Sequence, residues 1–396
     1  MTIRIKNTRQ TYQVAQPCSV EILLASDQPL QAGDTVRFQF PNSWSLVSGP
    51  SYTREFQTAD PHGPHYVSVA ATGGIPVDFD LSIEKRHLNY PQGMVRHGRL
   101  MTARLQAGNI PAGTPIRISY ANTVAPYISE IEEVWIRVNK EQPVQPPLLE
   151  TLSGPHEYFR ILVPSRVEQN REFEVLIVSL DRFDNASSTT FTGETLFLPD
   201  GTVTVQDISF SGTVQVPVQL ARSGVYRFCF KGAVSNAVKI GDNMQGPYWG
   251  DLHVHTKLSH DGQGTEPYVY AREVSGLDFA AVADHWTSLG PEGYRILKQW
   301  AEEANSPGVF VTLPADERNP EELNGHHNVY FSGIEAMERY QAVHDECSED
   351  SENDTDPPNS FSWLQEVDAS EVMIIPHHTG INFGDLPRRD SGSAID

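Results

Sequence analysis

Two hydrophobic patterns divide the chain near residue 245. Before that point, short runs such as residues 34–40 and 133–138 alternate apolar and polar residues, which is the period of a half-buried β-strand. Clusters of Gly, Pro, Asn and Asp separate these runs and are typical of turns. The first 240 residues are therefore predicted to form an all-β region.

A Pro-rich segment divides this β region in two. The sequence "EQPVQPP" starts at residue 141, and its composition is typical of a linker, which we place at residues 141–148. The linker separates a β-rich domain of residues 1–140 from a domain of residues 149–243. The second domain has about 95 residues of short strands, which is typical of an immunoglobulin-like β-sandwich.

After residue 245, predicted strands alternate with predicted helices. This alternation predicts an α/β domain with a parallel sheet or barrel, which we place at residues 246–396. The fold class is therefore multidomain, with all-β domains followed by an α/β domain. The strands are expected at residues 248–256, 277–285, 308–317, 327–333 and 371–378, and the helices at 266–276, 291–305 and 359–368.

Potential metal ligands recur at the ends of these strands. The carboxyl ends of parallel strands meet on one face of a barrel, and residues two apart on a strand point to the same side. His253 and His255 can therefore face one centre. Imidazole and carboxylate groups without clustered thiolates suit Zn, Mn or Fe. The strand ends carry His253, His255, His285, Asp316, Glu317, His326, His327, His377 and His378.

The charge of the chain is concentrated in the same region. The net charge is −22, and residues 248–396 hold 8 Lys+Arg against 28 Asp+Glu, so this part alone carries −20. An acidic loop at 344–360 contributes 7 of these acids, and bound divalent cations could offset part of the rest. An acidic surface repels phosphate backbones, which argues against nucleic acid as a partner.

The sequence also bears on location. It has no apolar stretch of the ~18 residues that a membrane helix needs, and its first residues lack the apolar core of a signal peptide. The three cysteines are scattered and odd in number, which suits a reducing compartment. We therefore expect a cytoplasmic protein without a membrane partner.

Five motifs together resemble the PHP superfamily, named for polymerase and histidinol phosphatase. They are "DLHVHTKLSHDG", "GLDFAAVADH", "LPADE", "GHHNVYF" and "IIPHHTG", within residues 248–384. The chain is most similar to an uncharacterised branch with β-domains before the metal-binding domain, where the likeness rests on "LDRFDN" and "SGVYRF…SNAVKI". The resemblance implies a distorted (β/α)7 barrel that holds two or three metal ions. Members of this family usually hydrolyse phosphoesters.

Carried over residue by residue, the resemblance implies a set of ligands, in which Glu317 bridges two metals. His260, His327 and His378 are alternates beside three of them, and Asp316 is a neighbour of the bridging carboxylate. Asp251 and Asp284 either orient ligands or accept hydrogen bonds at the strand ends. The implied ligands are His253, His255, Asp261, His285, Glu317, His326 and His377.

The C-terminal region departs from the family pattern. A barrel of seven βα units of about 30 residues needs about 210 residues. Only 149 residues follow residue 247, and nothing after "PHHTGINFGD" supplies the family's late motif with an acid and a histidine. We therefore expect a barrel that is incomplete at its C-terminus, and turnover by this chain depends on whether the missing strands are needed.

The predicted activity is metal-dependent hydrolysis of a small-molecule phosphoester. A divalent cluster lowers the pKa of bound water toward ~7, and no "G-x-S-x-G" motif or Cys–His pairing offers a protein nucleophile. An amidohydrolase-like hydrolase is the first alternative, but Lys257 and Lys298 do not lie at a strand end where that class places a bridging lysine. The second alternative is an inert truncated barrel whose β-domains bind carbohydrate or protein.

Overall fold

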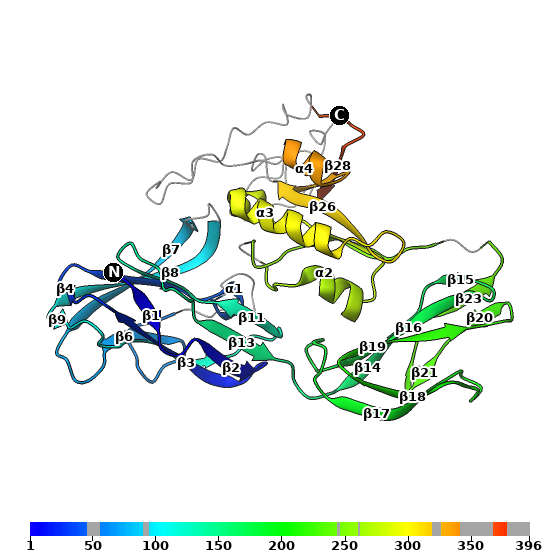
Figure 1. The fold of residues 1–396 in the computed structure, drawn as a ribbon, viewed down its shortest axis with the longest axis horizontal. Coiled ribbons are helices and arrows are strands. Elements are labelled where there is room, and N and C mark those ends of the chain that lie inside the picture. The colour runs from blue at the N-terminus through cyan, green and yellow to red at the C-terminus, as the bar shows by residue number, and fades with distance from the viewer. Residues whose placement is uncertain are drawn as a thin grey trace, which may run out of the picture.

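The structure is a computed structural model that describes residues 1–45, 56–89, 95–243, 246–259, 262–318, 326–340 and 367–377. Figure 1 shows two β-domains at opposite sides of the molecule, with a third domain that contains most of the helices above and between them. Among the described helices, none is long and apolar enough to cross a membrane.

The first β-domain comprises the described residues up to 152. Three sheets have the strand orders β1-β3-β10-β6, β12-β5-β8-β7 and β11-β13-β2, and β4 pairs with β9. Alternating apolar side chains such as Val20, Ile22 and Leu24 fill its core. The elements are β1 (Ile3–Ile5), β2 (Arg9–Gln13), β3 (Pro17–Ser26), β4 (Leu30–Gln31), β5 (Thr35–Gln39), α1 (Asn42–Ser45), β6 (Tyr66–Ala71), β7 (Asp78–Asn89), β8 (Val95–Ala107), β9 (Asn109–Ile110), β10 (Ile116–Val124), β11 (Glu130–Glu133), β12 (Trp135–Val138) and β13 (Leu148–Leu152).

The second β-domain comprises residues 153–243. Its sheets have the orders β14-β16-β19, β15-β23-β20 and β18-β17-β21-β22, around a core that includes Phe228 and Phe230. The elements are β14 (Tyr158–Leu162), β15 (Arg166–Glu168), β16 (Glu172–Leu180), β17 (Thr190–Phe197), β18 (Val203–Ser211), β19 (Thr213–Gln219), β20 (Gly224–Tyr226), β21 (Cys229–Phe230), β22 (Ala233–Val234) and β23 (Val238–Gly241).

The third domain comprises the described residues after 245 and contains one five-stranded sheet of order β24-β25-β26-β27-β28. The first three strands are parallel and are connected through helices, whereas β27 is antiparallel to both of its neighbours. The elements are β24 (Gly250–Val254), α2 (Pro267–Val269), η1 (Tyr270–Val274), β25 (Phe279–Val282), α3 (Trp286–Ala304), β26 (Val311–Arg318), β27 (His326–Phe331), α4 (Ile334–Tyr340) and β28 (Val372–His377).

This mixed, open sheet corrects the predicted fold class. The prediction of a PHP-type (β/α)7 barrel is wrong, because the described strands form no closed barrel and most regular structure is β. The segment between Arg318 and His326 is too short for the crossover that a parallel connection needs, so β27 returns antiparallel. The description of the chain as a PHP-domain hydrolase came from the five sequence motifs and implied that barrel, so it is corrected with it. The immunoglobulin-like description concerns the β region and is retained.

Both β-domains contact the third domain. Leu100 and Trp135 of the first β-domain belong to the same buried cluster as residues of α3 and of the strands β25 and β27. On the other side, Tyr270 donates a hydrogen bond from its hydroxyl to the Asp184 carbonyl over 3.1 Å. The backbone at Gly276, with φ of 63°, approaches the second β-domain so closely that a Cβ atom would lie 2.6 Å from Leu162. The third domain is thus held on two sides.

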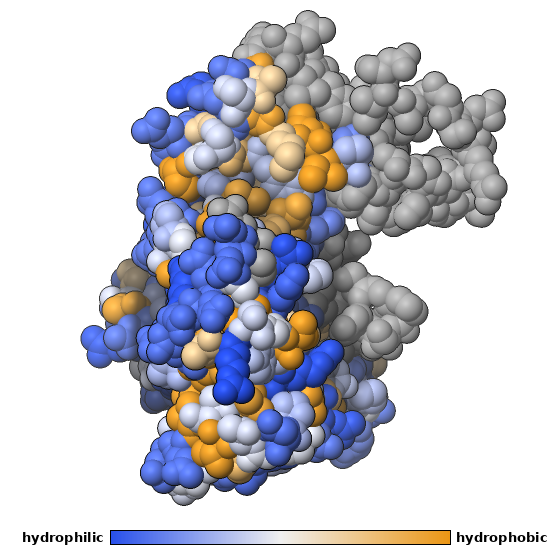
Figure 2. Space-filling model, turned by 90° about the vertical axis from the view of Figure 1, so that its right-hand side faces the viewer, coloured by the Kyte–Doolittle hydropathy of each residue, from blue (hydrophilic) through white to orange (hydrophobic). Residues whose placement is uncertain are grey.

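Figure 2 shows one face of the molecule. Hydrophilic residues cover much of this face, and hydrophobic residues are interspersed among them in small groups. Exposed valines of the second β-domain, such as Val203, Val225 and Val234, are separate in the sequence. Scattered apolar residues of this kind are normal for a solvent-facing surface and by themselves indicate no docking surface.

Candidate metal centre

Four adjacent strands bring histidines and one carboxylate to the same edge of the sheet in the third domain. His253 lies in β24, and His255 follows in the turn after that strand. His285 lies at the N-cap position of α3, three residues after β25 ends, and it forms an isolated β-bridge with Glu317 of β26. His326 is the first residue of β27. Strand ends therefore position all five side chains.

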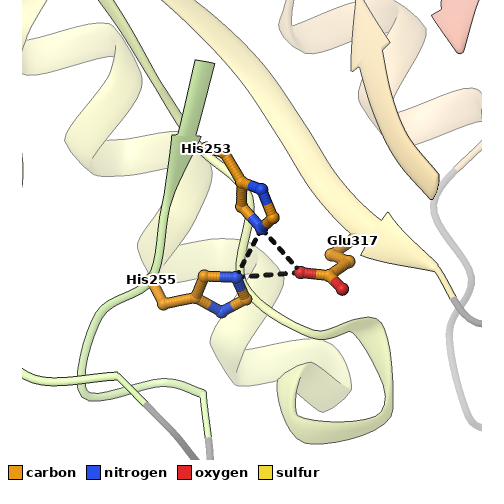
Figure 3. Close-up of side chains that lie close together, drawn as sticks. All are labelled: His253, His255 and Glu317. Carbon is orange, nitrogen blue, oxygen red and sulfur yellow. Dashed lines mark hydrogen bonds and ion pairs between the residues drawn. The ribbon is translucent and has the colours of Figure 1, made fainter. Parts of the chain in front are cut away.

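Three of these side chains converge on one point. The Nε2 atoms of His253 and His255 lie 2.9 Å and 2.8 Å from the same oxygen, Oε2 of Glu317. The two Nε2 atoms are themselves 2.7 Å apart. Figure 3 shows both imidazoles pointing toward the carboxylate from the opposite side. Two imidazole nitrogens and a carboxylate oxygen so arranged are suitable donors for one divalent ion.

The second oxygen of the same carboxylate faces a second set of imidazoles. The Nδ1 atom of His326 is hydrogen-bonded to Oε1 of Glu317, and Nδ1 of His285 lies 3.7 Å from it. The donor atoms of this set all lie within 4.8 Å of one another. Glu317 therefore lies between two donor sets, and each of its oxygens could ligate a different ion.

Burial and charge favour an ionised carboxylate at the centre. Burial by itself raises the pKa of Glu317, but hydrogen bonds with His253, His255 and His326 together outweigh it and hold that pKa well below its usual range. The side chain of His253 is 33 % exposed, whereas that of His285 is 8 % exposed. The centre is thus open toward solvent on the side of His253.

The two aspartates next to ligands make backbone contacts. Asp284 is fully buried and accepts hydrogen bonds from the backbone N–H and the hydroxyl of Thr256, each over 2.6 Å. Its burial raises its pKa to about 6, against the effect of these hydrogen bonds. Asp251 accepts a hydrogen bond from the backbone N–H of His253 over 3.0 Å. Asp284 therefore holds the turn after β24 in place, whereas the bond of Asp251 lies within β24 itself.

Other predicted residues lie away from the donor sets. Asp316 points to the opposite side of β26, where it forms a buried ion pair with Arg318 at 2.7 Å and accepts a hydrogen bond from Tyr294 over 2.8 Å. His327 is buried and belongs to neither donor set. The backbone of His377 pairs with that of His326, but nothing is described of its side chain. Three further predicted residues lie outside the described part of the chain: Asp261, His260 and His378.

Two neighbouring residues were missed by the reasoning from the sequence. The hydroxyl of Ser259 contacts Nδ1 of His255, and the hydroxyl of Thr256 donates a hydrogen bond to Asp284. Both follow the His-x-His motif, and Ser259 is the hydroxyl residue two positions before Asp261 in "SHDG". Hydroxyl residues are common in turns, so composition alone does not distinguish them from ordinary turn residues.

Comparisons with known proteins assign this chain to no family. No protein-family model matches the chain, and no curated protein matches it. Domains 4 and 5 of the S-layer protein SbsC are 12% identical with a TM-score of 0.16, and cover 30% of this chain and 69% of that one. A type II cohesin dyad of the scaffoldin ScaA of Acetivibrio cellulolyticus is 10% identical with a TM-score of 0.22, over 59% and 88%. The I9–I11 tandem of titin is 9% identical with a TM-score of 0.16, over 64% and 72%. At these TM-scores the likenesses carry no argument about function.

Proposed function

We propose that the chain binds divalent transition metal ions at two adjacent positions and uses them to hydrolyse a small-molecule phosphoester. The observation that carries the proposal is the position of Glu317, whose two oxygens face two separate sets of imidazoles. The two donor sets support this function without a closed barrel. Mn, Fe and Zn all fit imidazole and carboxylate donors without thiolates.

The chemistry follows from the donors and their surroundings. A divalent ion lowers the pKa of a bound water toward about 7 and so supplies a nucleophile near neutral pH. His253, His255 and Glu317 would hold one ion, and His285 and His326 would hold the other with the second oxygen of Glu317. The exposed side of His253 leaves room for water and substrate to approach. Buried Asp284 keeps the turn that carries His255 in position.

The first test measures metal content and turnover of the full chain. We expect more than one Mn, Fe or Zn per chain by elemental analysis after reconstitution, and metal-dependent hydrolysis of 4-nitrophenyl phosphate. His255→Ala should lower both metal content and turnover, because it removes a donor from one set. His62→Ala is the matched control, because His62 is an exposed histidine of the first β-domain. A chain that takes up no transition metal would overturn the proposal.

A further inference from the structure

A single hydroxyl group touches ligands of both donor sets. Ser259 lies in the turn after β24 and is 1 % exposed. Its Oγ lies 3.1 Å from Nδ1 of His255 and accepts the backbone N–H of His285 over 3.1 Å. His255 belongs to one donor set and His285 to the other. A shift of this hydroxyl would therefore disturb the two sets together.

The hydroxyl can also support the tautomer of His255 that metal binding through Nε2 requires. The Nε2 atom of this imidazole faces Oε2 of Glu317 at 2.8 Å and is the atom that would ligate an ion. A neutral imidazole that ligates through Nε2 carries its proton on Nδ1. Nδ1 can then donate that proton to Oγ of Ser259, in the way that neighbouring groups orient metal-binding histidines.

The first β-domain holds the backbone of this serine. The carbonyl oxygen of Ser259 accepts a hydrogen bond from Nδ2 of Asn42 over 2.8 Å, between residues 217 positions apart. Asn42 is the first residue of α1 and is 8 % exposed. Because the bond is buried, solvent offers no easy replacement for it, and its loss would leave a buried carbonyl with a poorer partner.

The two residues before Ser259 are also held by the first β-domain. Leu258 is buried in the same hydrophobic cluster as Leu100 of β8 and Trp135 of β12. Nζ of Lys257 lies 3.5 Å from Oε2 of Glu132 in β11. In Figure 1, β8 lies beside α3, which it contacts, and β11 lies below the third domain. Three consecutive residues of the turn thus make three different kinds of contact with another domain.

We propose that the first β-domain is part of the metal centre, because Asn42 acts through Ser259 as a positioning residue for His255 and His285. This inference rests on the proposed function, since positioning matters only if these histidines bind metal. The centre then reaches full affinity only when the first β-domain is docked onto the third domain. Asn42 bonds to the backbone of Ser259 and not to a donor atom, so it affects the positions of His255 and His285 through the turn after β24.

The main experiment compares the full chain with its Asn42→Ala variant. Zn²⁺ affinity, measured by competition with a chelating dye, should fall by about 10-fold, which is the lower end for residues that orient metal ligands. In the metal-free chain, amide hydrogen exchange over residues 253–259 should become faster. Asn7→Ala is the matched control, because the bonds of Asn7 to described residues lie within the first β-domain, where it accepts the N–H of Leu23 over 2.8 Å.

A second variant tests the route through the serine. Ser259→Ala should weaken Zn²⁺ binding by about 10-fold or more, and the ¹⁵N shifts of His255 should show a loss of the Nδ1-protonated tautomer. The variant that combines Asn42→Ala with Ser259→Ala should bind Zn²⁺ no more weakly than Ser259→Ala alone, because both changes act on the same turn. Wild-type affinity and wild-type exchange in Asn42→Ala would overturn the inference. A wild-type chain without metal affinity would instead overturn the proposed function, while exchange and tautomer would still decide whether Asn42 positions the turn.

Discussion

At the residue scale, one carboxylate determines whether two metal positions can exist. Glu317 is the only described residue shared by the two donor sets. Its two oxygens face different imidazoles, because Oε2 faces His253 and His255 and Oε1 faces His326. An amide in its place would keep the shape but would present one oxygen and one NH₂ group, which cannot ligate a cation.

Glu317→Gln is therefore expected to remove high-affinity binding at one position and weaken it at the other. We expect the stoichiometry to fall to one ion or fewer per chain. The remaining affinity should be lower by about 100-fold or more, beyond what the loss of an orienting residue costs. Calorimetric titration with Zn²⁺ measures both quantities. Glu141→Gln is the control, because Glu141 is exposed and lies in the first β-domain. Two ions bound by Glu317→Gln would contradict a bridging role.

At the element scale, the alternation of β26 gives its neighbouring acids different roles. Glu317 points to the donor sets, and Asp316 and Arg318 point to the other face. There the guanidinium of Arg318 bonds to both oxygens of Asp316 and to the carbonyl of Tyr340 at the end of α4, and Tyr294 of α3 bonds to Asp316. This buried pair connects β26 to two helices.

Asp316→Ala should destabilise the third domain without removing a metal donor. Loss of one partner leaves the charge of Arg318 buried, which costs about 3–5 kcal/mol in the free energy of unfolding. Urea unfolding of the metal-free chain measures this cost. Glu292→Gln breaks a surface ion pair with Arg295 on α3 and should have little effect, because exposed pairs contribute little. Equal stability losses in the two variants would show that the buried pair has no special role.

At the scale of the whole molecule, the interface between the first β-domain and the third domain contains a buried acid. Glu130 of β11 is 8 % exposed. Burial, and secondarily the charge of Glu132, raise its pKa to about 7, while Ser43, Lys257 and the backbone of Gly264 act in the opposite direction. The folded chain thus holds on to a proton that the unfolded chain releases at lower pH.

The sign of the resulting pH dependence follows from linkage. Between the ordinary pKa of 4.5 and the raised pKa of about 7, the unfolded state binds fewer protons than the folded state, so stability falls as pH rises through this window. We expect the free energy of unfolding to be lower at about pH 8 than at about pH 5, and this difference to shrink in Glu130→Gln. Glu133→Gln, an exposed change on the same strand, should retain the wild-type dependence. An unchanged profile in Glu130→Gln would assign the dependence to other groups.

Local patterns in the sequence determined much of what lies within single elements. Alternating apolar residues predicted the strands of the β region, and the run at 266–276 predicted a helix that the structure contains as α2 and η1, with Gly276 at φ of 63° after its end. The positions of the histidines and of Glu317 near strand ends were also readable. Such features depend on neighbouring residues, so a periodic pattern is sufficient to reveal them.

Only the tertiary structure decided how these elements meet. The order in which strands pair depends on hydrogen bonds between distant segments, so the mixed sheet that ends in β27 and β28 was not readable from the local pattern. Asp316 and Glu317 are adjacent, so only one of them can face the donor sets. Asp316 packs against Tyr294 of α3, which leaves Glu317 on the side of the donor sets. The hydrogen bond from Asn42 to Ser259 joins residues 217 positions apart, and no periodic pattern in the sequence predicts it. The docking of one domain on another created it, because burial joined two polar groups that the chain order keeps apart.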